Sequence, residues 1–483
     1  MSISSALTNA LSGLTAQSKA AELVSSNIAN VSTPGYARRE LILASRTVGT
    51  PGQGVQVVGV QRSVDLALLG DRRLAQSAAG DADTRAAFFK RVERAIGTPD
   101  DSSSISGRAA ALNSALIEAS SHPESESRLS NVLNSAKALA RQIGSASKDV
   151  QSARTTANAE IASQVNQLNI SLTRVAKLNS QINIGIAVRQ DVTSLQDQRQ
   201  QIVDQIARII PVREVQQPEG AIYLYTDSGK SILDVVPAVF GFTATNTVTP
   251  GMTNGAGLSG LTLNGNPIST GAGSFIAGGT LRANFAIRDE LGETAQAQLD
   301  AVARDLVERF ADPALDVTRA LGGPGLFTDN GAAFDPLTEV GLSQRLAINA
   351  AADPDQGGAL CRLRDGLGAT AIGPVGNSAL LNDLRAALTA AREPISGGFM
   401  AGQRSFANLA TDFLNSVATG RLNADGDATY AAARLETFTV LEAENGVDTD
   451  AEMQSLLQIE QAYAANAKVI AAVQQMIQAV LDI

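Results

Sequence analysis

The chain has 483 residues, which is enough for roughly three domains of about 150 residues. It carries 38 lysines and arginines against 48 aspartates and glutamates, and this net charge of −10 argues against a nucleic-acid partner. The chain has 13 phenylalanines, 5 tyrosines and no tryptophan, so it has few aromatic side chains to line a ligand pocket or fill a core. Small aliphatic side chains must do most of the packing.

The N-terminal residues lack the features of a secretory signal. The first basic residue is Lys19, so no basic segment precedes an apolar one. No apolar run approaches the roughly 18 residues that a membrane span needs. Cys361 is the only cysteine, which excludes an intramolecular disulfide and a thiolate metal cluster. We expect neither a cleavable signal nor membrane insertion.

The first 31 residues predict an amphipathic helix. They contain no proline, and apolar residues recur every seven positions in two seams. Pro34 and Gly35 should end this helix, and a loop should follow. Val55, Val57 and Val60 are bounded by glycines and suggest a short strand or an extended connector. The seams consist of Leu7, Leu14, Ala21 and Ile28, with Ile3, Ala10 and Val24 beside them.

A second helical interval spans residues 125–186, which contain no proline. An apolar seven-residue ladder runs from Leu129 to Ala157, and it then jumps by four residues to Ile161 and continues to Ile182. A four-residue insertion of this kind is a stutter, which locally unwinds a coiled coil. The alternative is a helical hairpin with a break at residues 154–158.

The sequence changes character after Pro211. Residues 211–280 are rich in threonine, glycine, asparagine and valine, and Asn264 with Gly265 is a hairpin signal, so short strands joined by turns are expected. Helical periodicity returns over residues 281–310. Glycine and proline dominate residues 312–375, where only short helical pieces such as 342–351 are expected.

The C-terminal part predicts helices at 378–391, at 404–419 and from about 430 to 483. The last helix has a two-seam heptad pattern and is apolar nearly all round, so we expect it to be buried on more than one side. Asn466, the only polar seam member, either fixes the register or lies against solvent. The seam members are Leu456, Ile459, Tyr463, Asn466, Ile470, Val473, Ile477 and Val480.

No motif predicts catalysis, a cofactor or a metal. His122 is the only histidine, so every histidine-dependent triad or metal site would have to use it; it lies in a loop before a proline with no histidine companion, and we interpret it as non-functional. Gly255, Gly257 and Gly260 have dinucleotide-loop spacing, but no helix signal follows them. Gly229–Lys230–Ser231 resembles the end of a phosphate loop, yet Leu224 stands where that loop needs glycine.

Two further candidate sites fail for similar reasons. Residues 423–434 have the spacing of a calcium loop, but Ala428 replaces the required glycine and Arg434 the final glutamate, so a solvated turn is expected. Cys361 has arginines nearby that could lower its thiol pKa. Without a second cysteine or a histidine nearby in the sequence, it is interpreted as inert.

Two terminal segments carry a family resemblance. SNIANVSTPGY at residues 26–36 closely resembles the N-terminal signature of the axial proteins of the bacterial flagellum, which are the rod, hook and hook-associated proteins. GVDTDAEMQSLLQIEQAYAANAKVI at 446–470 resembles their C-terminal signature. The interval 125–186, preceded by GRAAALNSALIEASSHPES, and the segment 277–303 resemble the FlgK family of the hook-filament junction.

The resemblance implies a non-enzymatic structural subunit of the extracellular flagellum. It also implies export through the flagellar type III channel without cleavage, an export chaperone, assembly into a ring, and contacts with the hook protein and with a second junction protein next to the filament. The apolar seams and the matched signatures give the residues expected to carry assembly: Leu7, Leu14, Asn27, Ile28, Asn30, Pro34, Gly35, Tyr36, Leu456, Ile459, Tyr463, Asn466, Ile470, Val473 and Ile477.

We therefore expect a mainly α fold with an inserted β domain, long helices and a terminal coiled coil. Because an N-terminal helix can meet a C-terminal one only if the chain doubles back, the domains should be nested and discontinuous. The alternatives are a hook subunit, which would have dominant β content, and a secreted hydrolase. The expected domains are residues 1–50 with 440–483, 51–210 with 277–312 and 376–439, the β-rich insertion 211–276, and the irregular segment 313–375.

Overall fold

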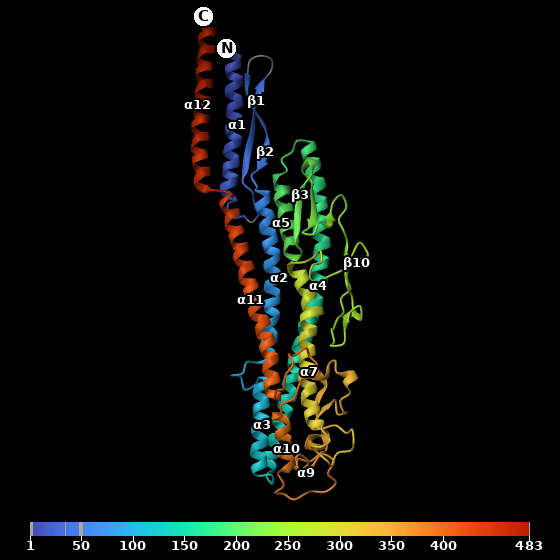
Figure 1. Cartoon of the computed structure of the whole chain (residues 1–483). Helices are drawn as coiled ribbons and strands as arrows, with labels where there is room; N and C mark the ends of the chain where they lie inside the picture. The colour runs from blue at the N-terminus through green and yellow to red at the C-terminus, as the bar shows by residue number, and fades with distance from the viewer. Residues whose placement is uncertain (1–2, 34, 48–51, 483) are drawn as a thin grey trace.

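The computed structural model describes residues 3–33, 35–47 and 52–482. The molecule is elongated, and its two termini lie at the same end (Figure 1). It is 61% helical with a few small sheets. This confirms the expected mainly α fold with an inserted β region. Among the described residues, no helix is both long and apolar enough to cross a membrane.

The terminal end contains two helices and a hairpin. Helix α1 (Ile3–Ala29) packs beside α12 (Thr449–Leu481), and α1 also contacts the antiparallel pair β1 (Arg39–Thr47) and β2 (Gly52–Arg62). The expectations of helix α1 and of a strand around residue 55 are confirmed. The expected loop after residue 36 is wrong beyond residue 38, because residues 39–47 find a strand partner in β2.

Helix α4 (Glu126–Ala187) is continuous over 62 residues, so the helical-hairpin alternative is wrong. It packs with α3 (Ile105–Ser121) near one end and with α5 (Thr193–Ile209) near the other. Every member of the two predicted α4 ladders is buried. The ladder up to Ala157 belongs to one hydrophobic core, and its continuation from Ile161 to Val175 belongs to a second. The stutter therefore marks the boundary between two cores.

The expected β-rich segment forms small sheets beside α4 and α5. The first sheet is antiparallel and consists of β3 (Val212–Gln216), β4 (Ile222–Thr226) and β5 (Ser231–Leu233). A second contains β6 (Phe240–Gly241), β9 (Leu261–Leu263) and β10 (Asn266–Ile268), and a parallel pair contains β7 (Thr253–Asn254) and β8 (Gly257–Leu258). The predicted hairpin at Asn264 and Gly265 is confirmed, and both residues have the positive φ that such a turn requires.

The chain returns through helices α6 (Gly279–Ala286) and α7 (Gly292–Ala311), which confirms the helix expected at 281–310. A π-helical turn, Ile287–Leu291, joins them and packs against α4. Arg154 of α4 lies against this turn and is fully buried, and its Nε donates to the Arg288 carbonyl oxygen at 2.7 Å. The stutter and the π turn thus occur at the same level of two packed helices.

The segment after α7 is irregular, as expected. It contains β11 (Phe327–Asp329), α8 (Leu342–Arg345), β12 (Leu346–Ile348) and α9 (Arg362–Asp365), with short 3-10 turns between them. The helical piece expected at 342–351 is only partly right, since its second half pairs as a strand with β11. These elements lie at the end of the molecule opposite the termini (Figure 1).

The last helices are α10 (Ala379–Thr389), α11 (Phe406–Glu444) and α12. Helix α2 (Leu66–Ile96) lies along α11. The break expected between 419 and 430 is wrong, because the chain leaves the helix only between Asn445 and Asp448. The solvated turn expected at 423–434 is also wrong, because it lies within α11. Packing on α2 and ion pairs from Asp425 to Lys90 and Arg421 hold this stretch helical.

Candidate assembly site

The terminal helices α1 and α12 pack along one face of each. On α1, four apolar residues and Asn27 are buried, and on α12 Val473 is 1% exposed. Asn466 faces α1 at Gly13, where an added Cβ would lie 2.9 Å from Nδ2 of Asn466. Of the seam residues predicted for assembly, Leu7, Leu14, Ile28, Leu456, Ile459, Asn466 and Ile470 are half-buried, whereas Tyr463 and Ile477 are exposed.

Most of α12 faces solvent in the single chain. Only Glu452 and Val473 of this helix are buried among the described residues. The expectation that α12 is buried on more than one side is therefore wrong for the chain alone. Its exposed large apolar side chains are Met453, Leu457, Tyr463, Val469, Met476, Ile477, Val480 and Leu481. An apolar surface of this extent on a protruding helix is typical of an interaction site.

Asn27 is the centre of the junction between α1 and the hairpin. Its Oδ1 accepts from the Tyr36 hydroxyl at 2.9 Å and from the backbone N of Arg39 at 3.0 Å, and its Nδ2 donates to the Arg39 carbonyl at 3.0 Å. The Arg39 guanidinium lies 4.9 Å from the centre of the Tyr36 ring. The signature residues thus fix the direction in which the chain leaves α1.

The same amide also reaches α12. Nδ2 of Asn27 donates to Oε2 of Glu452 at 3.2 Å, and Nε of Arg38 donates to Oε1 of the same carboxylate at 2.7 Å. Glu452 is 1% exposed. Its hydrogen bond raises the pKa of Arg38 above the ordinary value. Asp448 begins α12 as its N-cap, accepting from the backbone N of Asp450 and of Ala451.

The rest of the N-terminal signature makes local contacts and reaches α5. Nδ2 of Asn30 donates to the Ser26 carbonyl at 2.9 Å, which closes the last turn of α1. Gly35 has φ +75°, and a Cβ there would lie 2.7 Å from Cγ of Gln201, so a side chain would meet both strain and a clash. Pro34 lies outside the described residues.

Asp197 of α5 ties the hairpin to the body. Its carboxylate pairs with Nη2 of Arg39 at 2.9 Å and with Nε of Arg62 at 2.7 Å, one arginine from each strand of the hairpin. Sequence reasoning missed Arg38, Asp197 and Glu452. The arginine pair directly after the signature and the acid in the first turn of α12 were available signals, but nothing local shows that they meet.

The other residues considered for chemistry are not assembled into a site. His122 is exposed and its Nδ1 lies 3.1 Å from Glu124, and Cys361 is half-buried before α9. The glycines 255–260 belong to turns around β7 and β8 rather than to a strand-to-helix loop. Within the described ranges, no group of three or more histidine, cysteine, aspartate or glutamate residues could hold a metal ion.

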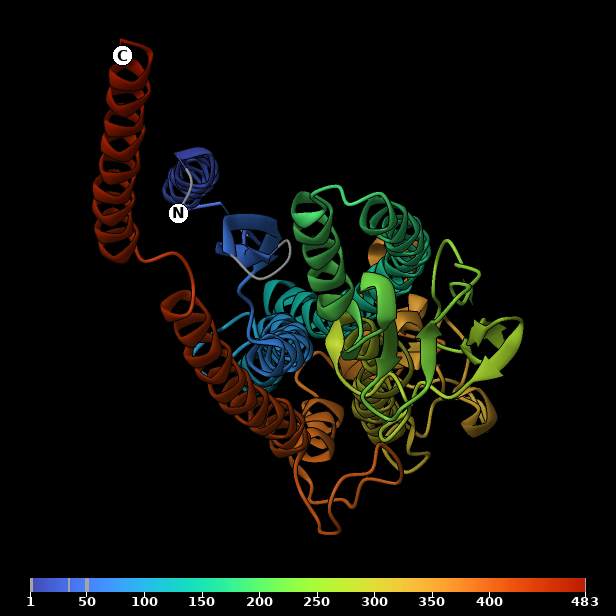
Figure 2. The same ribbon diagram turned by 90° about the horizontal axis from the view of Figure 1, so that it is seen from above.

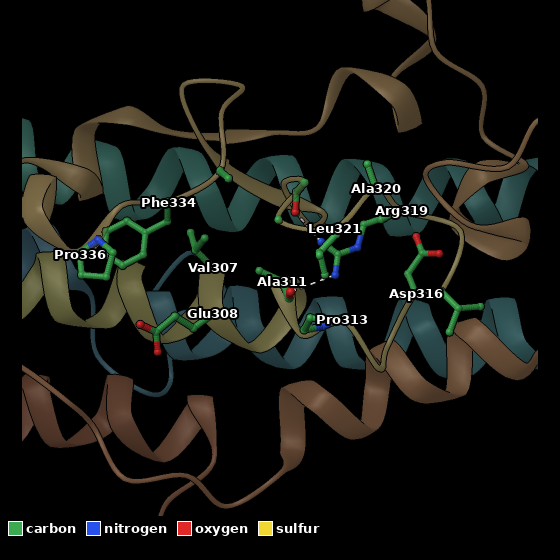
Figure 3. Close-up of a pocket in the computed structure, with 14 residues that line it drawn as sticks. Val307, Glu308, Ala311, Pro313, Asp316, Arg319, Ala320, Leu321, Phe334 and Pro336 are labelled. Carbon is green, nitrogen blue, oxygen red and sulfur yellow. Dashed lines mark hydrogen bonds between the residues drawn. The ribbon is translucent and has the colours of Figure 1, made fainter.

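A hollow beside the end of α7 has a structural explanation (Figure 3). The Arg319 guanidinium crosses it and donates to the carbonyl oxygens of Ala311 at 2.9 Å and Gly323 at 2.7 Å. Arg319 thereby satisfies the open C-terminus of α7 and holds the following loop. The two carboxylates that line the hollow are already engaged, since Glu308 pairs with Arg304 and Asp316 accepts from the backbone N of Thr318 and of Leu367.

Three family models match the chain in order. "Flagella basal body rod protein" matches residues 7–36, "Flagellar hook-associated protein FlgK helical domain" matches 89–313, and "Flagellar basal body rod FlgEFG protein C-terminal" matches 441–483. The first of these covers α1 from residue 7 onward and the whole N-terminal signature. The last covers α12 with its junction to α11.

Curated relatives carry the same family name. Flagellar hook-associated protein 1 of Salmonella typhimurium is 31% identical over 231 residues, which are 46% of this chain and 41% of the relative. That of Bacillus subtilis is 28% identical over 245 residues, 48% of each chain. The matches thus span less than half the length of these relatives.

A solved structure is also similar to the chain. The flagellar hook junction protein FlgK from Burkholderia pseudomallei matches at 22% identity with a TM-score of 0.43, covering 54% of this chain and 46% of that one. The helical-domain match, the two terminal matches and the shared name of the curated relatives point to the same family. Over residues 89–313 the chain is similar to the helical domain of the FlgK family of flagellar hook-associated proteins, and at both ends it is similar to flagellar rod proteins.

Proposed function

We propose that this protein is a non-catalytic structural subunit of the extracellular bacterial flagellum that joins the hook to the filament. The observation that carries the proposal is the protruding pair α1 and α12, whose outer face displays apolar side chains that the single chain leaves in water. The helical content of 61% disfavours the hook-subunit alternative, which would have dominant β content.

Assembly would complete the packing of the terminal helices. Residues 1–50 with 440–483 would form the assembling domain, in which neighbouring copies cover α12 and build a ring around the channel. The hook protein on one side and a second junction protein on the filament side are the expected partners. The remaining domains, 51–210 with 277–312 and 376–439, 211–276 and 313–375, would form the body outside this layer.

Export would precede assembly and would use the flagellar type III system and an export chaperone. The N-terminal signature region is the segment that we expect to hold the export signal. Removal of residues 2–30 should therefore leave the protein in the cytoplasm, as fractionation and immunoblotting would show. Normal secretion of the truncated protein would contradict this part of the proposal.

A deletion strain tests the function. Without the gene, cells should build hooks but release flagellin into the medium, and the wild-type chain should restore filaments and swimming. Leu457→Asp, which places a charge on the exposed face of α12, should fail to restore them. Leu337→Asp is the matched control, because Leu337 is 93% exposed at the opposite end of the molecule. Filaments on the deletion strain, or full rescue by Leu457→Asp, would contradict the proposal.

A further inference from the structure

A groove of about 850 Å³ lies between the hairpin β1–β2 and the connection from α4 to α5. Its walls combine apolar and basic side chains. Ile42, Val58, Leu66 and Ile186 lie in it and are between 38% and 61% exposed. Single exposed apolar residues are common on protein surfaces, but four of them gathered in one concave surface form a patch. Such a patch indicates a contact surface.

Within the described part of the chain, the groove presents one unpaired basic side chain, Arg189. Lys19, Arg62, Arg189 and Arg199 line it, with Asp191 as the single acid among its described lining residues, but Lys19 pairs with Glu22, Arg62 pairs with Asp197, and Arg199 is only 4% exposed. Burial lowers the pKa of Arg199 to about 10, which leaves it charged at neutral pH. Arg189 is exposed and has no ion-pair partner among the described residues. The groove therefore suits an acidic and apolar ligand.

A segment with this composition lies around the joint between α11 and α12. Residues 435–467 contain seven acids and no lysine or arginine. Glu444 and Asp450 are exposed on either side of the joint, and Leu441 and Met453 are exposed beside them at 40% and 49%. This segment offers acidic groups to the basic side chain of the groove and apolar side chains to its apolar walls.

The two surfaces face opposite sides of one molecule. Seen from above, α11 and α12 lie on one side of α1 and the hairpin, while α5 and the end of α4 lie on the other (Figure 2). Both surfaces are at a similar level along the long axis (Figure 1). A chain cannot fill its own groove in this arrangement. Two different complementary patches on opposite sides are what a head-to-tail ring of identical subunits requires.

We propose that the groove between the hairpin and the α4–α5 connection receives the acidic α11–α12 joint of a second copy of this chain. The proposal rests on the proposed function, since it names the surfaces through which the subunits of the ring meet. Each contact would bury the exposed apolar residues of both surfaces. Arg189, the unpaired basic residue of the groove, would set the orientation, because charge complementarity fixes register more than it adds affinity.

A charge swap tests the contact in the deletion strain. Arg189→Glu and Glu444→Lys should each weaken the contact about tenfold, equivalent to about 1.4 kcal/mol, so that flagellin is released. The double variant should restore filaments by re-forming the pair with reversed signs. Arg174→Glu is the matched control, because Arg174 is an exposed arginine of α4, the helix that precedes Arg189, and lies outside the groove.

The outcomes separate this contact from the general function. If the wild-type chain fails to restore filaments, the proposed function is wrong. If the wild-type chain restores them but either single variant does so equally well, the groove contact is wrong. The contact is also wrong if the double variant stays as defective as the singles, or if Arg174→Glu is as defective as Arg189→Glu.

Cross-linking keeps the proposal testable if a charge variant is not secreted. Arg189→Cys with Glu444→Cys in a Cys361→Ser chain, treated with a short bis-maleimide in isolated hooks, should give a ladder of covalent multimers. Either single cysteine should give no ladder beyond a dimer. Monomers alone from the double-cysteine chain in assembled junctions would overturn the contact.

Discussion

The side-chain amide of Asn27 and the carboxylate of Glu452, 425 positions apart, share a buried hydrogen bond of 3.2 Å. Arg38 donates to the other oxygen of the carboxylate. Because Glu452 lies in the first turn of α12, these contacts fix where that helix starts relative to α1. The assembly surface of α12 is thus oriented by two residues of the N-terminal segment.

Loss of this carboxylate should loosen α12. Glu452→Ala leaves Asn27 and Arg38 without their hydrogen-bond acceptor. Loss of a hydrogen bond to a charged group typically lowers the stability by about 1.5–3 kcal/mol. Hydrogen exchange of residues 449–481 should accelerate accordingly, and less so for Glu452→Gln, which keeps an acceptor for Asn27. Glu460→Gln, an exposed acid on the same helix, should leave exchange unchanged. Equal exchange in Glu452→Ala and wild type would refute this orienting role.

The contact of Gly13 with Asn466 sets the spacing between α1 and α12. A methyl group at Gly13 would lie 2.9 Å from the Asn466 amide, so Gly13→Ala alone should increase protease cutting in α12. Gly13→Ala with Asn466→Ala should restore protection, since the double variant removes the clash and gains about 1 kcal/mol of helix propensity. Continued sensitivity of the double variant would show that the two helices are not spaced by this contact.

Asn466 should also influence assembly. A seam asparagine fixes register at some cost in stability, so Asn466→Leu should be exported but form off-pathway oligomers. Asn466→Ala should weaken junction assembly without unfolding the body. The size of the secreted proteins reports off-pathway oligomers, and swimming assays report junction assembly. If both variants are secreted as monomers and support full swimming, Asn466 has no role in setting the register.

Arg154 should anchor the β insertion to α4. It is fully buried, and its guanidinium donates to the carbonyl oxygens of Arg288 and of Met252, both at 2.7 Å. Arg154→Met removes these donors and should destabilise the region by about 3 kcal/mol. Proteolysis between residues 245 and 260 reports the release of the loop. Arg141→Met on the exposed face of α4 is the control, and equal cleavage of both variants would contradict the anchor.

Acid should weaken the end of the molecule opposite the termini. The Asp365 carboxylate accepts from Nε of Arg364 at 2.7 Å and from the backbone N of Gly373, and these bonds hold the pKa of Asp365 below its ordinary 3.8. An acid with a lowered pKa in the folded state stabilises the fold above its unfolded-state pKa. That stabilisation is lost as the pH falls through the lower folded-state pKa.

Asp365→Asn should therefore lower the urea midpoint at pH 7, by a change corresponding to about 1.5–3 kcal/mol. The difference from wild type should shrink below about pH 3.8. Asp383→Asn, at an exposed position of α10, should show no such difference at either pH. A pH-independent deficit of Asp365→Asn would mean that packing, and not ionisation, is responsible.

The sequence by itself determined the elements whose signals are local. The seven-residue ladders of α1 and α4, the hairpin at Asn264 and Gly265 and the return helices follow from periodicity and turn chemistry within a few residues. The four-residue jump after Ala157 is likewise a local signal, although only the structure shows that it lies at the boundary between two cores. Each of these elements is specified by residues close together in the sequence, so its own segment is enough to predict it.

Only the tertiary structure decided the features that depend on distant partners. Strand β1 exists because β2 pairs with it, and α11 continues through Gly420 because that glycine leaves room for the ring of Phe89. The meeting of Asn27 with Glu452 likewise has no local signal. In all three, the free energy that selects the conformation comes from contacts between segments far apart in the chain, and that contribution overrides local propensity.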